Sequence, residues 1–387
     1  MSLSSLLRFS ALRVFLLSLL SFSLAVAQQI QPRPLIVSPI DESRVVTLRG
    51  NVHPLAQPMF DMGAAPPDLP MNRMMLVLKH DPMQDYVVRK LIDDQQDKNS
   101  PNYHKWLTPS EFGAQFGASD QDVQLITGWL QSHGFQINRV SNGRTVIEFS
   151  GVEGQVEQAF HTQIHQFALP NGEQHWANSS DPQIPAALAP AVEGIQALNN
   201  FKAQHFAHVA GVVSRDKSTG QFSSSSPLFT LTGNCGVQSH CYAVGPYDFA
   251  KIYNIAPSWS ATPPIDGTGQ TIAIVGETDI NPQDIADFRN FFGLPPYGQS
   301  GGPSLNIIHN GPVPGILNDG EETESDLDVE WSGAVAKGAS VDFVVSQTTE
   351  TSLGINLSAL YIVDNNLAPV MSESYGFCEL FLGTAGN

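Results

Sequence analysis

Basic residues and long apolar runs are both scarce in this chain of 387 residues. The sequence carries 19 Lys and Arg against 37 Asp and Glu, which gives a formal net charge of −18. A surface this acidic repels polyanions, so nucleic acid and anionic membranes are excluded as expected partners. After residue 27 no stretch is apolar enough to span a bilayer, and we expect no membrane association once the first residues are removed.

The N-terminus has the order of a secretory signal peptide. Arg8 and Arg13 precede an apolar run at residues 14–24, which ends in the small residues 25–27. This order predicts a signal peptide at residues 1–27 and a secreted, extracellular product. A membrane anchor is the alternative, but the run is short and contains several serines.

Cysteine is rare, with three in the whole chain. In an exported protein an odd number leaves one cysteine without a partner inside the chain. Cys235 and Cys241 are close enough in sequence to bridge a small loop, and we expect this pairing. Cys378 is left over, either as a buried free thiol or because its partner lies beyond Asn387, which would mean that the fold is interrupted.

Lysine and arginine are absent from residues 290–336, although seven acids lie within residues 319–330. Among these, Glu324 and Asp328 are four positions apart, so on a helix they would lie roughly 40° apart around the axis. At about 6 Å and an effective dielectric near 20 they repel by about 3 kcal/mol, roughly two pKa units. The sequence therefore predicts a jointly titrating pair with raised pKa values that suits proton transfer in acid. A solvated, acidic first helical turn is the alternative.

The first half of the chain has an α+β pattern. The expected elements are a strand at 74–78, helices at 85–96 and 120–133, a hairpin turning at Asn142-Gly143, a helix at 152–160 and a closing strand at 164–168. This order predicts a compact module of ferredoxin-like type. Nothing in the module has a catalytic pattern, and we expect Trp106 and Phe112 to pack in its core and loops.

The second half alternates strands and helices. At residues 267–275 a glycine turn precedes an apolar strand that is too uniform to alternate, which is typical of a parallel sheet covered on both faces. Because these glycines precede the strand, they do not form a phosphate-binding loop. The further expected elements are a helix at 281–293, a strand at 305–308, the acidic helix at 322–336, a strand at 341–345, a helix at 352–363 and a strand at 369–372. This alternation predicts a doubly wound parallel sheet with right-handed crossovers.

Several segments resemble the sedolisin family of serine-carboxyl peptidases. The segment Tyr-His-Lys-Trp-Leu-Thr-Pro at residues 103–109 is similar to the activation propeptide of kumamolisin-type members, and residues 245–255 resemble the start of their catalytic domain. The order from Glu324 and Asp328 to the strand at 341–345 resembles the helix that carries the family's Glu-x-x-x-Asp pair. The resemblance implies an α/β fold: an incomplete subtilisin-like doubly wound parallel sheet, preceded by a ferredoxin-like α+β propeptide domain.

The resemblance also implies a division of the chain into parts. These are a signal peptide at 1–27, an activation propeptide domain at 28–200, a linker at 201–230, and the N-terminal part of a peptidase catalytic domain at 231–387. The linker, rich in His, Gly and Ser, is the expected place of a maturation cut, and a passive tether is the alternative. The propeptide is expected to bind its own catalytic domain.

The site residues follow from the same resemblance. It implies that Glu324 is the general base for a Ser nucleophile and that Asp328 supports Glu324. The family's nucleophile lies in a Gly-Thr-Ser segment and its oxyanion Asp in a Ser-Gly-Asp-Ser-Gly type segment, and this sequence contains neither. Calcium is expected for the complete catalytic domain, at a site that is not in this chain. Ser374 follows a strand as a nucleophile would, but it lacks the preceding Gly of a nucleophile elbow and is expected instead to end a strand beside the substrate cleft.

The sequence thus predicts a secreted, acid-active serine-carboxyl endopeptidase precursor that hydrolyses peptide bonds in proteins or peptides. Since the nucleophile and oxyanion segments are missing, the chain as it stands is expected to be inactive. The main alternative is a secreted, non-catalytic inhibitor or binding module of propeptide type. An acid glycosidase that uses the carboxyl cluster is a further alternative, although no aromatic platforms flank the pair.

Overall fold

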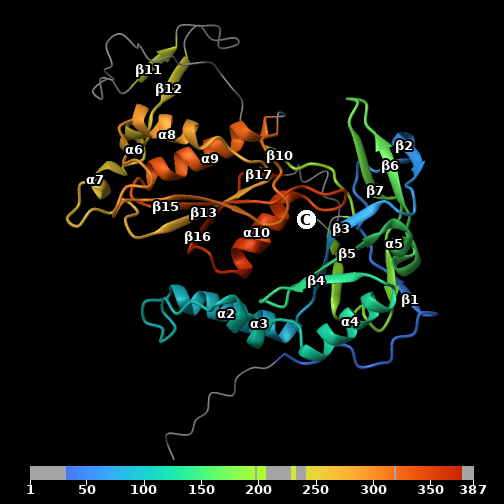
Figure 1. Cartoon of the computed structure of the whole chain (residues 1–387). Helices are drawn as coiled ribbons and strands as arrows, with labels where there is room; N and C mark the ends of the chain where they lie inside the picture. The colour runs from blue at the N-terminus through green and yellow to red at the C-terminus, as the bar shows by residue number, and fades with distance from the viewer. Residues whose placement is uncertain (1–31, 197, 206–227, 232–240, 318–319, 377–387) are drawn as a thin grey trace, which may run out of the picture.

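The structure is a computed structural model that describes residues 32–196, 198–205, 228–231, 241–317 and 320–376. Its elements form two groups, an N-terminal one with antiparallel sheets and a C-terminal one around a parallel sheet (Figure 1). The predicted signal peptide and most of the predicted linker lie outside the described residues, as do Cys235 and Cys378. The expected disulfide therefore stays a prediction.

The N-terminal group is built on a four-stranded antiparallel sheet. Its strands, in the order β4-β5-β3-β9, are β3 (Pro70–Leu78), β4 (Gln136–Val140), β5 (Val146–Val152) and β9 (Val192–Gln196). With β9 as the fourth strand, this order is consistent with the predicted ferredoxin-like module. The predicted strand at 74–78 and the hairpin around Asn142-Gly143 are both present.

The predicted strand at 164–168 is present, but the prediction that it closes the ferredoxin-like module is wrong. β6 (Ile164–Ala168) is a strand, but it pairs with β2 (Asp61–Ala64) and β7 (Gln174–Asn178) in a separate three-stranded sheet. A further pair joins β1 (Val45–Thr47) to β8 (Gln183–Pro185), and a short 3-10 helix spans Pro58–Phe60. An alternating pattern predicts a strand but not its partner, because the partner is chosen by packing between residues that are distant in sequence.

Four helices accompany these sheets: α2 (Pro82–Gln96), α3 (Pro109–Phe116), α4 (Asp120–Ser132) and α5 (Glu153–Phe160). α4 begins as predicted, with the Ser119 side chain accepting a hydrogen bond from the backbone N–H of Asp122. α3 was not expected from the sequence. Its signal is a capping box in which Thr108 and Glu111 satisfy each other's backbone N–H groups.

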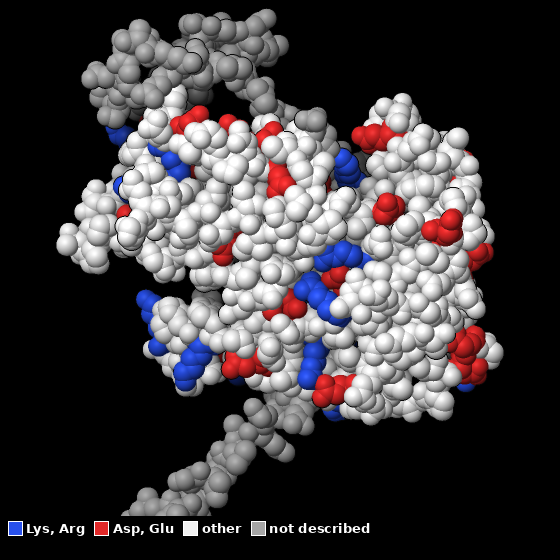
Figure 2. All heavy atoms as spheres, viewed as in Figure 1, with Lys and Arg blue, Asp and Glu red and all other residues white. Residues whose placement is uncertain are grey.

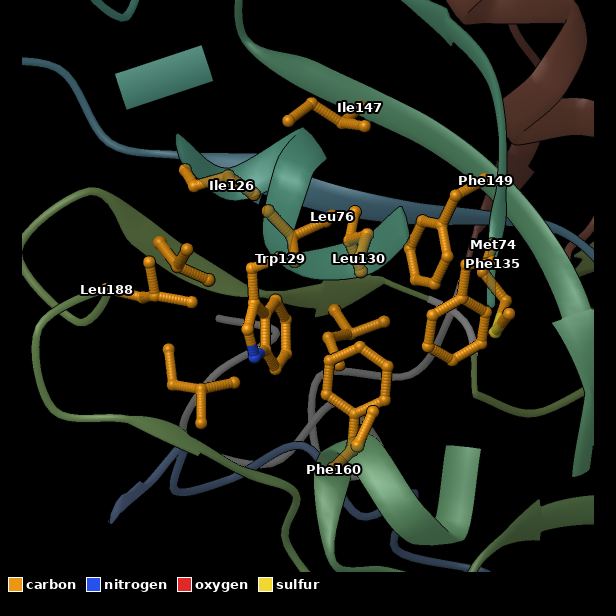
Figure 3. Close-up of a cluster of buried hydrophobic side chains, with 14 of the residues drawn as sticks. Met74, Leu76, Ile126, Trp129, Leu130, Phe135, Ile147, Phe149, Phe160 and Leu188 are labelled. Atoms are coloured by element: carbon orange, nitrogen blue, oxygen red, sulfur yellow. The ribbon is translucent and has the colours of Figure 1, made fainter. Parts of the chain in front are cut away.

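An aromatic cluster fills the core of the N-terminal group (Figure 3). Trp129 of α4 meets Phe160 of α5 edge-on at 5.4 Å between ring centroids, and Phe135 meets Phe149 of β5 in the same way at 5.2 Å. Trp106 does not join this core, since it is 60 % exposed; it packs in the loop before α3, where its ring stacks with that of His104 at 5.7 Å between ring centroids. It lines an open, mostly apolar cleft of about 500 Å³ between α2, α3 and the C-terminal group.

The C-terminal group contains the predicted parallel sheet. Its strands, in the order β14-β15-β13-β16, are β13 (Thr271–Gly276), β14 (Leu305–His309), β15 (Ser340–Val345) and β16 (Val370–Ser372). The helices between them are α8 (Pro282–Phe291), α9 (Glu321–Val335) and α10 (Gly354–Asp364). Residues of α8 and α9 pack on one face of the sheet and residues of α10 on the other, so the sheet is covered on both faces as expected.

Smaller elements complete the C-terminal group. A hairpin of β11 (Leu228–Leu231) and β12 (Cys241–Val244) leads into α6 (Pro246–Ile252) and α7 (Ala256–Trp259). β10 (Gln204–His205), at the start of the predicted linker, pairs with β17 (Tyr375–Gly376), which follows the parallel sheet. In the view of Figure 2 acidic and basic side chains lie close together along the junction between the two groups.

Candidate active site

The acidic helix α9 runs from Glu321 to Val335, within one residue of the predicted bounds. It packs on the sheet through buried Val329 and Ala334, and its first turns reach the edge at which the parallel strands end. Glu324 is 4 % exposed, so the alternative of a solvated first turn is wrong for this side chain. A carboxyl group is placed in the interior only when it has partners or a chemical use.

Asp328, one turn after Glu324, is bound by a hydroxyl group. The Oγ of Ser374 donates a hydrogen bond of 2.7 Å to Oδ1 of Asp328. Oδ2 of Asp328 is buried and has no hydrogen-bond partner among the residues that the structure describes. Burial raises the pKa of Asp328 to about 6; the Ser374 hydrogen bond opposes this shift, and the charge of Glu324 adds to it. The predicted rise is therefore confirmed for Asp328, but burial, rather than repulsion by Glu324, is its largest cause.

Glu277 and the hydroxyl of Tyr375 are two more buried polar groups of this region. Glu277 follows the last residue of β13, is 4 % exposed, and accepts a hydrogen bond of 2.6 Å from the Oγ1 of Thr348. Burial raises the pKa of Tyr375, and the nearby charges of Glu321 and Glu277 raise it further. The site thus gathers acids and hydroxyl groups in a poorly solvated place.

These side chains meet because of the sheet's topology. Glu277, Thr348 and Ser374 each follow the carboxyl end of a parallel strand, and α9 starts at that same edge. In open α/β sheets ligands bind outside this edge. Glu277 and the contact of Ser374 with Asp328 were not predicted from the sequence, although Glu277, as the first polar residue after the predicted strand at 267–275, carried a usable signal.

A second acidic group lies on another face of α9. Carboxylate oxygens of Asp284, Glu322 and Asp326 all lie within 4.8 Å of one another. Burial and then neighbouring carboxylates raise the pKa of Asp326 to about 7 and that of Glu330 to about 8. Calcium takes about six to eight oxygen ligands, and we assign no metal to these carboxylates. The calcium expected for a complete catalytic domain stays a prediction.

Comparison with known proteins agrees with the architecture. Residues 60–201 match the model of the pro-kumamolisin activation domain. Sedolisin of Pseudomonas sp. (strain 101) is 24 % identical over 282 residues, and kumamolisin of Bacillus sp. (strain MN-32) is 25 % identical over 286, each match covering 72 % of this chain. Xanthomonalisin of Xanthomonas sp. (strain T-22) is 26 % identical over 296 residues, or 74 % of this chain.

These similarities support membership of the sedolisin family. The matched part covers 43 % of sedolisin, 46 % of kumamolisin and 33 % of xanthomonalisin, so the chain spans less than half the length of these relatives. The alignments with these relatives, of 282 to 296 residues, are longer than the activation-domain match at residues 60–201, so the similarity continues beyond that domain. Among the helices that the structure describes, none has the length and apolar character needed to cross a membrane.

Proposed function

We propose that this chain carries the activation propeptide and the first part of the catalytic domain of a secreted, acid-active serine-carboxyl endopeptidase precursor. The observation that supports this most is the burial of Glu324 one turn before Asp328, on a helix that starts at the ligand-binding edge of a parallel sheet. The activation-domain match in the first half of the chain supports the precursor part of the proposal.

In the proposed mechanism, Glu324 takes the proton from a Ser hydroxyl as that hydroxyl attacks a peptide carbonyl, and Asp328 supports Glu324. Both assignments rest on the family's Glu-x-x-x-Asp pattern. The raised pKa of Asp328 suits acid chemistry, because a carboxyl group that holds its proton to higher pH can exchange it in a mildly acidic medium. The Gly-Thr-Ser segment that supplies the family's nucleophile is not in this sequence, so we propose that the chain alone does not hydrolyse peptides.

The pair can be tested in the chain itself. The side-chain carboxyl ¹³C chemical shift of Asp328, followed from pH 3 to pH 9, should show a titration with an apparent value near 6. Glu324→Gln should convert the response of Asp328 into a single step at lower pH, because a neighbouring charge is removed. An Asp328 titration near the ordinary value of about 4 that Glu324→Gln leaves unchanged would rule out a coupled pair.

The activity requires a product that contains the nucleophile. If the coding region is expressed together with the frame that follows the Asn387 codon, that product should digest denatured haemoglobin at mildly acidic pH. Glu324→Gln should then abolish turnover, whereas Glu330→Gln, on another face of the same helix, should leave most of it. Undiminished digestion by the Glu324→Gln variant would show that Glu324 is not the base.

An inhibitory or binding role remains the second candidate, because the N-terminal group of this chain already contacts the C-terminal group through side-chain hydrogen bonds. The chain should then inhibit an intact member of the family such as kumamolisin in a concentration-dependent way. If the peptidase stays fully active at every pH at which the chain is folded, the chain is not an inhibitor.

A further inference from the structure

Ser374 lies where it can control the second carboxyl group of the pair. Its hydroxyl comes from the loop after β16, 46 positions beyond Asp328 in sequence, and donates to Oδ1 over 2.7 Å. The contact therefore joins the end of the sheet's β16 to the helix α9, which otherwise packs on β13 and β15. Because Ser374 sits at the carboxyl end of a strand, its backbone is fixed by the β13–β16 pairing at Ile274 and Ser372.

The two carboxylate oxygens of Asp328 differ in their hydrogen bonds. Oδ1 receives the Ser374 proton, and an oxygen that accepts a hydrogen bond is the less favourable place to carry a proton of its own. Oδ2 is buried and meets no donor or acceptor in the described part of the chain. When Asp328 takes up a proton, Oδ2 is therefore the oxygen that carries it.

The charged groups around Asp328 do not supply a competing partner. Glu324 lies one turn earlier on the same helix, and its charge acts on Asp328, so this charged neighbour is an acid. From the α8 side the buried cation is Arg289, and its three donor nitrogens bind the carbonyl oxygens of Pro295, Gly333 and Lys337. Among the residues that the structure describes, the Ser374 hydroxyl is the side-chain donor to Asp328.

We propose that Ser374 is a positioning residue of the catalytic pair: its hydroxyl holds Oδ1 of Asp328 and so keeps the exchangeable proton of Asp328 on Oδ2. This inference rests on the proposed function for its catalytic meaning, but the contact and its effect on Asp328 do not depend on peptidase activity. Ser374 acts through Asp328 and is not assigned as the nucleophile.

The test uses the chain as it exists, with ¹³C-labelled aspartate. In Ser374→Ala the titration of Asp328 should move upward by roughly one pKa unit, because a hydrogen bond to the charged form is lost. Ser374→Thr keeps the hydroxyl and should restore the original value. Ser372→Ala, two residues earlier in β16, is the matched control and should leave Asp328 unchanged.

A second readout separates positioning from simple stabilisation. If Ser374 orients Asp328, the titration of Asp328 should move in Ser374→Ala while the backbone amide spectrum of the sheet stays the same. Should Ser374→Ala fail to fold, Ser374→Cys, with its weaker donor, should give a shift in the same direction.

The results distinguish this inference from the proposed function. An unchanged Asp328 titration in a folded Ser374→Ala variant overturns the positioning role even if Glu324→Gln shifts that titration. An Asp328 titration that Glu324→Gln leaves unchanged overturns the catalytic pair, but the Ser374 contact still stands if Asp328 responds to Ser374→Ala and recovers in Ser374→Thr. In an active longer product, Ser374→Ala should lower kcat and displace its pH profile while KM stays the same.

Discussion

Arg73 and Asn310, 237 positions apart in sequence, join the N-terminal group to the parallel sheet. Nη1 of Arg73 donates to the carbonyl oxygen of Asn310 at 2.7 Å, and Nη2 donates to its Oδ1 at 3.3 Å. Nε of the same guanidinium donates to buried Glu148 at 2.7 Å. Arg73 has a φ of 59°, a left-handed backbone conformation that non-glycine residues rarely adopt. A strained residue that binds both groups indicates that the junction is specific.

Arg73→Ala should weaken this junction. The variant loses the bonds to Asn310 and one of the two arginine partners of Glu148, although Arg139 still donates to Glu148 at 2.9 Å. We expect a loss of about 2 kcal/mol in the free energy of unfolding, and faster hydrogen exchange at residues 346–358. Arg89→Ala, at an exposed position of α2, is the control and should change neither quantity. Equal stability of the two variants would mean that the Arg73 contacts contribute nothing.

Gly113 of α3 is packed against the hairpin between β4 and β5. A Cβ at this position would lie 2.2 Å from the carbonyl oxygen of Asn142, and that oxygen belongs to the backbone. Gly113→Ala should therefore push α3 away from the hairpin and destabilise the chain by roughly 1–3 kcal/mol. Gly128 of α4 is the matched control, because a Cβ there meets nothing within 4 Å.

In Gly128→Ala the lost flexibility of the unfolded chain should instead stabilise the helix by about 0.5–1 kcal/mol. Thermal unfolding of the two variants should thus shift in opposite directions from the unchanged chain. A stabilised Gly113→Ala variant would contradict the close approach of α3 to the hairpin. The same turn also binds Asp364 of α10 through the side chain of Asn142 at 2.8 Å, so Gly113→Ala should loosen the junction as well.

Arg289 is 1 % exposed and joins α8 to the end of α9. It donates to the carbonyl oxygens of Pro295, Gly333 and Lys337 at 2.6, 3.0 and 2.9 Å. Arg289→Met keeps the volume but leaves those oxygens without donors, and we expect a loss of roughly 3 kcal/mol in chemical denaturation. Arg144→Met breaks only the exposed pair with Asp120 and should cost less than about 1 kcal/mol. Similar losses in both variants would mean that burial of Arg289 has no special effect.

The local patterns predicted local structure well. The acidic helix, the strand at 341–345 and the cap at Ser119 appear within a residue or two of the expected places, because periodicity and capping depend on neighbours in sequence. Local patterns did not predict the sheet to which the strand at 164–168 belongs, because this depends on the distant strand with which it pairs. They also did not predict helix α3, which is too short to show a periodic pattern.

The candidate site, like the fold, was predictable only where it depends on residues that are close in sequence. The joint placement of Glu324 and Asp328 follows from a four-residue step, which the sequence contains. Contact of Asp328 with Ser374 requires knowing that β16 lies next to β13, and this is a property of the sheet order rather than of any local pattern. Burial of Glu277 depends on the same order. Sequence reasoning could therefore predict the pair but not the residues that surround it.

Asp326 and Glu330 should make the folded chain more stable in acid than at neutral pH. Burial raises the pKa of Asp326 to about 7 and that of Glu330 to about 8, above their ordinary values of 3.8 and 4.5. Below about pH 4 both the folded and the unfolded chain hold these protons, so no penalty arises. As pH rises from there to about 8, the unfolded chain releases its protons first, and the folded state loses stability.

Glu330→Gln should therefore raise the melting temperature at pH 8 and have little effect at pH 4. Because Glu330 is partly exposed, solvent weakens this effect. We expect a gain of about 1 kcal/mol in the free energy of unfolding, or about 2–4 °C in Tm. Asp287→Asn, an exposed acid on the neighbouring helix α8, is the control and should change Tm little at either pH. Asp326→Asn should behave like Glu330→Gln, and the double variant should gain less than the sum because the two carboxyl groups share one cluster. A Tm gain of equal size at pH 4 and pH 8 would show that the amide acts through packing or helix propensity. Ionisation of Asp326 and Glu330 would then not destabilise the folded chain.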